Sequence, residues 1–190
     1  MIDKFERKNY FKDELSQTVQ ILYNEQKINK NKISLDFKLP ENYYSEPFFN
    51  VSKNLKVKKG DNAIPFKEID LNGNTFDLYK LKGKKILLVF STINCGYCKM
   101  TAEQFSSSEF KLKNNVEVIY LKPLDSKESI KNFQNKFVFY FPILAQSKSI
   151  AELYGINGYP TFIEINENFI IEEIKLGYSR EFINRFNQNE

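Results

Sequence analysis

Apolar and polar residues follow different patterns in different parts of this chain, and each pattern predicts a different kind of element. Over residues 1–29 apolar side chains recur at a mostly helical spacing on a strongly charged background, which predicts one amphipathic helix. Residues 33–39 alternate apolar with polar and end before a proline, so we expect a short strand there. Residues 41–59 show no clear period and are interpreted as a connector that aromatic side chains hold against the domain.

A regular succession of elements begins near residue 60. Residues 65–70 and 75–77 flank a turn in which Asn72 and Gly73 both tolerate positive φ, which predicts a β-hairpin. The next elements expected are a helical turn at 78–81, a buried strand at 85–91, a helix that begins near the first cysteine, a strand at 116–121, helices at 126–137 and 147–154, strands at 161–166 and 169–175, and a helix from about 179. Alternating strands and helices predict an α/β fold with a parallel core and right-handed crossovers, followed by an antiparallel pair.

Both cysteines of the chain, Cys95 and Cys98, fall where the buried strand is followed by a helix. Backbone N–H groups and the positive end of the helix dipole stabilise an anion at such a junction, so Cys95 is expected to ionise more readily than a free thiol. The chain has no histidine, which excludes Ser-His-Asp and Cys-His catalysis and histidine-ligated metals. Two cysteines without histidine do not make an ordinary zinc site, so we expect no metal and assign redox chemistry to the pair.

Length and charge bound the other functions. The 190 residues suit one domain with an extension, and we expect an N-terminal extension over 1–57 and a domain over 58–190. The net charge of +4 includes short lysine clusters without an arginine-rich or aromatic-interleaved stripe, so nucleic acid is not expected as a partner. No apolar run is long enough for a transmembrane segment, and the N-terminus lacks the apolar core of a signal peptide. We therefore expect either a cytoplasmic protein or one whose export segment is absent from this sequence.

Four segments occur in an order that matches a known family. They are the hairpin with Asp70-Leu-Asn-Gly, the Leu81-Lys-Gly-Lys segment, the strand leading into Cys95-Gly-Tyr-Cys98, and Tyr154-Gly-Ile-Asn-Gly-Tyr-Pro-Thr161. A Cys-x-x-Cys pair followed by Gly-Tyr-Pro-Thr at the start of a later apolar strand is a specific combination. Over residues 58–188 the chain resembles the thioredoxin superfamily, and within it the bacterial TlpA/ResA-type thiol-disulfide oxidoreductases. The resemblance implies a thioredoxin-like fold, a central mixed β-sheet flanked by helices.

The same resemblance implies a redox-active disulfide between Cys95 and Cys98, without a metal or organic cofactor. Cys95 is expected to attack a substrate disulfide as a thiolate, and Cys98 to resolve the mixed disulfide. Pro160 is expected to be cis beside the disulfide, which leaves the backbone of Tyr159 free to pair with an extended substrate segment. The implied partners are protein dithiols or disulfides and a redox protein that supplies electrons, and the usual setting of the family is the periplasm or cell envelope.

Several positions depart from the family pattern. Asn94 replaces the usual tryptophan, Val89 replaces the buried acid of thioredoxins, and Thr101 replaces the glutamate of ResA-like proteins. No general base is therefore assigned, and water and Lys99 are both open as routes for proton transfer to and from Cys98. Gly96 and Tyr97, expected to contribute to substrate binding, are like the dipeptide of bacterial disulfide isomerases rather than that of reducing thioredoxins. The direction of electron flow is therefore open between reduction and isomerisation.

Two other functions are consistent with parts of the sequence. Thr92-Ile-Asn-Cys95 matches the Thr-x-x-Cys portion of peroxiredoxins, and this match favours a thiol peroxidase as one alternative. Against it, Leu88 stands where the peroxiredoxin motif has proline. A non-catalytic adaptor that presents the N-terminal helix to a partner is the other, and the same helix is a candidate homodimer contact. Assays of peroxide consumption, and removal of residues 1–57, would separate these functions from disulfide exchange.

Overall fold

The structure is a computed structural model that describes residues 4–11, 14–22 and 55–189 of the chain. It divides the chain into two units, Met1–Ser45 and Glu46–Glu190. The strand predicted at 33–39 lies outside the described residues, as does the connector up to residue 54. None of the described helices is long and apolar enough to cross a membrane.

The predicted N-terminal amphipathic helix is wrong, because this part of the chain forms an antiparallel strand pair. β1 (Lys4–Phe11) pairs with β2 (Glu14–Leu22). Thr18, Val19 and Ile21 are β-branched, which lowers helix propensity and favours an extended backbone. Val19 and Ile21 also stand two positions apart, the spacing of one strand face rather than of one helix face. The adaptor and homodimer hypotheses that relied on a helix here therefore lose the element on which they were based.

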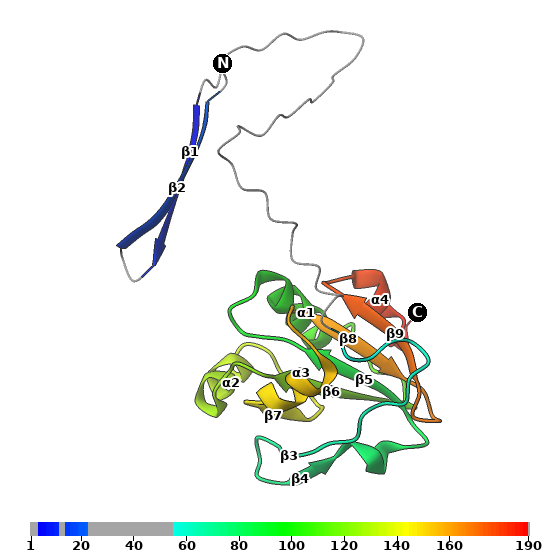
Figure 1. Ribbon diagram of the computed structural model, residues 1–190. Coiled ribbons are helices and arrows are strands. Elements are labelled where there is room, and N and C mark those ends of the chain that lie inside the picture. Colours follow the sequence, from blue (N-terminus) through cyan, green and yellow to red (C-terminus); the bar gives the residue numbers. More distant parts are fainter. Residues whose placement is uncertain (1–3, 12–13, 23–54, 190) are drawn as a thin grey trace, which may run out of the picture. The chain divides into compact units, whose positions relative to one another are not determined.

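The second unit is organised around a five-stranded mixed sheet with the strand order β7-β6-β5-β8-β9 (Figure 1). β5 (Lys85–Phe90), β6 (Val116–Lys122) and β7 (Ile143–Ala145) are parallel to one another. β8 (Thr161–Ile165) is antiparallel to β5, and β9 (Ile171–Leu176) is antiparallel to β8. This arrangement confirms the predicted thioredoxin-like fold, with its parallel core and closing antiparallel pair.

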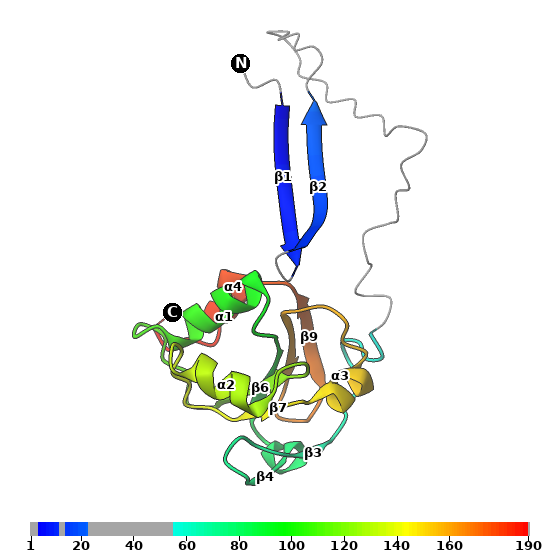
Figure 2. The same ribbon diagram turned by 90° about the vertical axis from the view of Figure 1, so that its left-hand side faces the viewer.

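Helices cover both faces of this sheet (Figure 2). α1 (Gly96–Ser106), α2 (Lys127–Gln134) and α4 (Arg180–Asn184) contribute apolar side chains to one face. α3 (Lys148–Tyr154) and the 3-10 helix η2 (Leu78–Leu81) contribute to the core on the opposite face. The sheet is therefore the middle layer of three, and α1 enters its face directly from the end of β5.

The predicted hairpin ahead of the sheet is confirmed. β3 (Lys67–Ile69) pairs antiparallel with β4 (Thr75–Asp77). In the loop between them the Asp70 carboxylate accepts the backbone N–H of Asn72 at 2.9 Å, and Gly73 takes a φ of 87°. Of the two turn residues that tolerate positive φ, only the glycine uses it, because the aspartate side chain holds the rest of the turn.

Alternation along β5 separates its side chains between the two faces. Ile86, Leu88 and Phe90 belong to the core beneath α3, whereas Leu87 and Val89 belong to the core beneath α1 and α4. The alternation also places the polar residues at positions 85 and 91, one at each end, on the α1 and α4 face. This face is therefore polar at both ends of the strand and apolar between them.

Candidate active site

The turn from β5 into α1 presents the two cysteines differently. Cys95 is the N-cap of α1, and the backbone N–H of Cys98 donates to Cys95 Sγ at 3.2 Å. A helix N-cap ordinarily supplies an oxygen acceptor for such an N–H, and here a sulfur takes that role. Both cysteines are free thiols; Cys95 is partly exposed, whereas Cys98 is 1% exposed. One sulfur is therefore accessible to a partner, and the other lies beneath it.

Burial determines the protonation state of the inner thiol. Burial, with a smaller contribution from a hydrogen bond with Cys95, raises the pKa of Cys98 to about 12, while the backbone of Thr92 and the hydroxyl of Ser91 act in the opposite direction. Because a thiolate rather than a thiol is the nucleophile, Cys98 must lose a proton before it can attack another sulfur.

The loop before β8 brings Tyr159 and Pro160 to the accessible thiol. The peptide bond between these two residues is cis, and Cys95 Sγ donates to the Tyr159 carbonyl oxygen at 3.6 Å. Pro160 is buried, and its carbonyl oxygen accepts the N–H of Gly177 at 2.8 Å. Segments far apart in the sequence therefore meet at one sulfur atom.

The two residues between the cysteines lie at the surface. Gly96 and Tyr97 form the start of α1, and Tyr97 is 64% exposed. The Tyr97 carbonyl oxygen accepts the hydroxyl of Thr101 at 3.0 Å, which fixes the first turn of the helix. The position at which ResA-like proteins carry glutamate is thus occupied by a buried hydroxyl that serves the helix backbone.

Asp125 belongs to this site, although the sequence did not identify it. Its carboxylate accepts the hydroxyl of Thr92 at 3.2 Å and the backbone N–H of Ile93 at 3.1 Å. The residue is only 7% exposed and follows the end of β6. It therefore fixes the loop that leads into Cys95. In the sequence it precedes the Ser126 cap of α2, where an acidic residue is unremarkable.

A buried lysine lies behind the inner thiol and was also missed. Lys122, at the end of β6, is 0% exposed, and its Nζ donates to Ser91 Oγ at 3.1 Å. Nζ lies 4.8 Å from the ring centroid of Tyr120 and 4.6 Å from that of Phe133. Burial lowers the pKa of Lys122 to about 8, and the charges of Asp125 and of both cysteines oppose this shift. An amine that titrates near neutrality thus sits next to the hydroxyl that contacts the thiol.

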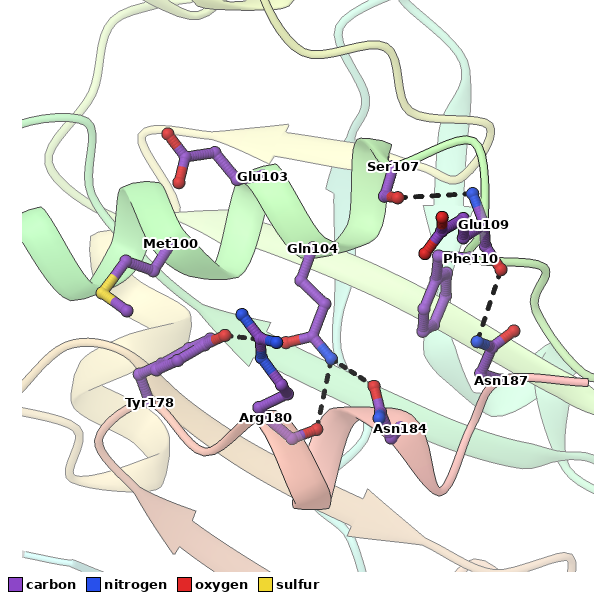
Figure 3. A pocket seen from close by; sticks show the side chains of 10 residues that line it. All are labelled: Met100, Glu103, Gln104, Ser107, Glu109, Phe110, Tyr178, Arg180, Asn184 and Asn187. Atoms are coloured by element: carbon purple, nitrogen blue, oxygen red, sulfur yellow. Dashed lines mark hydrogen bonds between the residues drawn. The ribbon is translucent and has the colours of Figure 1, made fainter. Parts of the chain in front are cut away.

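A cleft of about 390 Å³ separates α1 from α4 (Figure 3). Gln104 bridges it, because its Nε2 donates to the Arg180 carbonyl oxygen at 3.2 Å and to Asn184 Oδ1 at 2.5 Å. Its Oε1 accepts the hydroxyl of Tyr178 at 3.1 Å. None of the six site residues predicted from the sequence lines this cleft. The paired cysteines therefore lie outside it.

The groups around the two sulfurs are hydroxyls, backbone amides, an amine and one carboxylate. Within the described part of the chain, no group of three or more His, Cys, Asp or Glu side chains is placed to hold a metal ion.

Comparison with known proteins places this site in a family. The model of the AhpC/TSA family matches residues 59–176. The chain belongs to the AhpC/TSA family. This AhpC/TSA chain is 29% identical to the thioredoxin-like protein YneN of Bacillus subtilis over 128 residues, which are 66% of this chain and 75% of YneN. It is 28% identical to the thiol-disulfide oxidoreductase ResA of Halalkalibacterium halodurans over 124 residues, 64% of this chain and 70% of ResA.

Solved structures share the fold. StoA of Bacillus subtilis matches with a TM-score of 0.52 and 25% identity, covering 61% of this chain and 90% of StoA. A putative thiol:disulfide interchange protein DsbE from Chlorobium tepidum matches with a TM-score of 0.59 and 18% identity, covering 68% of this chain and 93% of that protein. Together with the Cys-x-x-Cys spacing of Cys95 and Cys98, family and relatives establish the class of enzyme expected from the sequence. The AhpC/TSA chain is a thiol-disulfide oxidoreductase of the thioredoxin superfamily.

Proposed function

We propose that this enzyme exchanges disulfides with protein substrates, with Cys95 as the nucleophile and Cys98 as the resolving thiol. The asymmetry between the two sulfurs carries the proposal. Cys95 is accessible and accepts a backbone N–H at 3.2 Å, whereas Cys98 is buried with its pKa raised to about 12. Only the accessible sulfur can meet a substrate disulfide, and the buried one is placed to act inside the molecule.

The reaction proceeds through two successive thiol-disulfide exchanges. The Cys95 thiolate attacks one sulfur of the substrate disulfide, forms a mixed disulfide and releases the other substrate sulfur as a thiolate. Cys98 then loses its proton and attacks Cys95 Sγ, which forms the Cys95–Cys98 disulfide and releases the second substrate thiolate. The enzyme dithiol is oxidised and the substrate disulfide is reduced; the reverse sequence oxidises a substrate dithiol. A redox partner protein restores the starting state.

The surface around Cys95 supports a protein substrate. The Tyr159 carbonyl oxygen, 3.6 Å from Cys95 Sγ, is a main-chain group just before β8, where an extended segment can add as a short strand. Pro160 follows it and has no N–H to compete for that segment. Gly96 and Tyr97 border the nucleophile with an exposed backbone and an exposed ring. An open surface of this kind fits a polypeptide better than a small molecule, which needs a concave pocket.

The thiol peroxidase alternative has less support from the same geometry. Thr92, the residue that matches the peroxiredoxin motif, donates its hydroxyl to Asp125 at 3.2 Å, and its backbone contacts the inner thiol Cys98. A thiol peroxidase would also need an arginine beside the reactive cysteine. Arg185, which follows α4, instead pairs with Glu164 at 2.6 Å. An assay of hydrogen peroxide consumption should therefore show no turnover above that of a Cys95→Ser variant.

Trapping of the mixed disulfide tests the proposal. A Cys98→Ser variant, mixed with an oxidised protein such as insulin, should accumulate a covalent complex through Cys95 that dithiothreitol dissolves. A Cys95→Ser variant is the matched control and should form none. If Cys95→Ser still reduces insulin, or if Cys98→Ser forms no complex, the assignment of roles is wrong.

The direction of exchange follows from the reduction potential of the Cys95–Cys98 couple. Equilibration with glutathione buffers, read by mass spectrometry after alkylation, gives this potential. A value near about −270 mV would mark a reductase, and a value near about −120 mV an oxidant.

A further inference from the structure

The second exchange of the proposed function, on which this inference rests, requires a group that takes the proton of Cys98. Cys98 must give up a proton, and at neutral pH its thiol holds that proton because the side chain is buried. The position that carries a buried acid in thioredoxins is Val89, which lies in the apolar core. Glu103, the nearest carboxylate in sequence, is more than half exposed and pairs with Lys99 at 3.7 Å. Neither position supplies a proton acceptor beside the inner thiol.

A polar path leads inward from Cys98 on the same face of the sheet. The ladder between β5 and β6 pairs Phe90 with Leu121 and continues with a bond from the Ser91 N–H to the Leu121 carbonyl at 3.0 Å. Ser91 therefore lies beside Lys122, and the Lys122 Nζ donates to Ser91 Oγ at 3.1 Å. The Ser91 hydroxyl donates in turn toward Cys98, where it stabilises the thiolate. The amine of Lys122, the hydroxyl of Ser91 and the sulfur of Cys98 thus follow one another on this face of the sheet.

The geometry points to a proton relay in which Ser91 takes the proton of Cys98 and passes its own proton to the neutral amine of Lys122. The Cys98 sulfur becomes a thiolate, the serine hydroxyl is regenerated, and the amine becomes an ammonium. The electron pair freed on Cys98 forms the bond to Cys95 Sγ, and the pair of the broken mixed disulfide leaves with the substrate sulfur. In the reverse exchange the ammonium returns the proton along the same chain.

The surroundings of Lys122 suit an acceptor that is free to titrate. It forms no ion pair with any residue in the described part of the chain, and aromatic rings of Tyr120 and Phe133 flank its Nζ. Burial holds its pKa to about 8, so a fraction of the amine is neutral at pH 7. The charged groups that face it are the carboxylate of Asp125 and the two cysteine sulfurs, and each favours the ammonium form.

The charge on Cys95 links the proton relay to the progress of the reaction. Burial is the main cause of the raised pKa of Cys98, but the hydrogen bond and the charge of Cys95 add to it. Once Cys95 Sγ is bonded to a substrate sulfur, it no longer carries that charge. The pKa of Cys98 then falls toward that of Lys122, and proton transfer becomes easier when the resolving attack is needed.

Reduction of dithiobis(nitrobenzoate) separates the two exchanges. The reduced enzyme releases one thionitrobenzoate when Cys95 attacks and a second when Cys98 resolves the mixed disulfide, so stopped-flow absorbance shows two phases. A Lys122→Met variant should slow the second phase about a hundredfold at pH 7, the scale of general base catalysis, and leave the first phase within about twofold. The second-phase rate of the parent should show an inflection near pH 8 that the variant lacks.

Two further variants make the outcome decisive. Ser91→Ala removes the hydroxyl between the lysine and the thiol while the lysine itself stays in place, and it should slow the second phase in the same way. It also carries the test if Lys122→Met fails to fold. Glu103→Gln, which removes the nearest carboxylate in sequence, should leave both phases unchanged. An unchanged second phase and pH profile in both Lys122→Met and Ser91→Ala would overturn the relay. Absence of the first phase in the parent enzyme would instead overturn the proposed function.

Discussion

The two ends of β5 hold buried charge in opposite ways. At its beginning, the carboxylate of Glu164 is 1% exposed and lies 2.7 Å from Lys85 Nζ and 2.6 Å from an Arg185 nitrogen. Past its end, Lys122 is fully buried beside Ser91 and forms no ion pair with any described residue. Both clusters lie on the sheet face that α1 and α4 cover. One buried charge is therefore neutralised within the fold, and the other is left free to change its protonation state.

The two lysines show what this difference does. The hydrogen bond with Glu164 is the largest cause that raises the pKa of Lys85, whereas burial lowers the pKa of Lys122 to about 8. A lysine with a carboxylate partner keeps its charge to a higher pH than a free lysine does. A lysine without one exchanges protons near neutrality, which is a property of catalytic groups rather than of structural ones.

The largest effect on stability is expected from removing the ion pairs of Glu164 at the beginning of β5. Replacing Lys85 and Arg185 together by methionine leaves Glu164 buried without a cation. Breaking a buried pair in this way costs about 3 to 5 kcal/mol, so urea denaturation should show a loss of that size in the free energy of unfolding. A Lys84→Met control removes the more exposed pair with Glu117, seen at 2.6 Å, and should cost less than about 1 kcal/mol. A loss in the double variant no larger than in this control would contradict the structural role.

The second effect is the change of stability with pH that Lys122 causes, past the end of β5. The pKa of Lys122 is lowered in the folded protein from 10.5 to about 8, so the charged form opposes folding below pH 8 and the opposition disappears as the pH rises to 10.5. The free energy of unfolding of the parent, relative to Lys122→Met, should therefore rise by about 3 kcal/mol over that interval.

Lys85→Met provides the opposite sign as a control. Because the pKa of Lys85 is raised by folding, its contribution to stability is present at low pH and is lost as the pH rises through the raised pKa. Relative to this variant, the parent should lose stability with rising pH. The same sign for both lysines would show that the two ends of β5 do not differ as described.

The smallest effect is expected at Asp125. In Asp125→Asn one of the two bonds to Thr92 and Ile93 loses its acceptor, because an amide has a single oxygen. The cost should be about 1 kcal/mol in the free energy of unfolding. Since the Asp125 charge raises the pKa of Lys122, the inflection in the second phase of thiol release should also move to lower pH. An inflection that stays in place would separate Asp125 from the relay.

The sequence predicted those parts of the site that depend on local pattern. The apolar run of β5 and the Cys95–Cys98 spacing are contiguous in the chain, and so is the segment that contains Tyr159 and Pro160. The same local reasoning failed at the N-terminus, where the charged background concealed the period-two spacing of Val19 and Ile21.

The relay residues could not be predicted in this way. Along β6, Val118, Tyr120 and Lys122 occupy one face, but a lysine at the end of an apolar strand is ordinarily solvated. It is buried here because Phe133 of α2 and the buried side of α1 close over that end of the sheet, which involves contacts between distant segments. The same holds for Asp125, whose partners lie more than 30 positions earlier in the chain.

Leu87 and Val89, the apolar pair in the middle of β5, keep the two polar ends apart. Lys85 and Ser91 are six residues apart in an extended strand, a distance of about 20 Å. Substitutions separated by this much, with no shared partner, add in free energy to within about 0.5 kcal/mol. Mutations beside Ser91 can therefore change the surroundings of the cysteines without altering the ion pairs of Lys85 at the other end of the strand. Substitutions at the two ends of this one strand should therefore contribute separately to the free energy of unfolding.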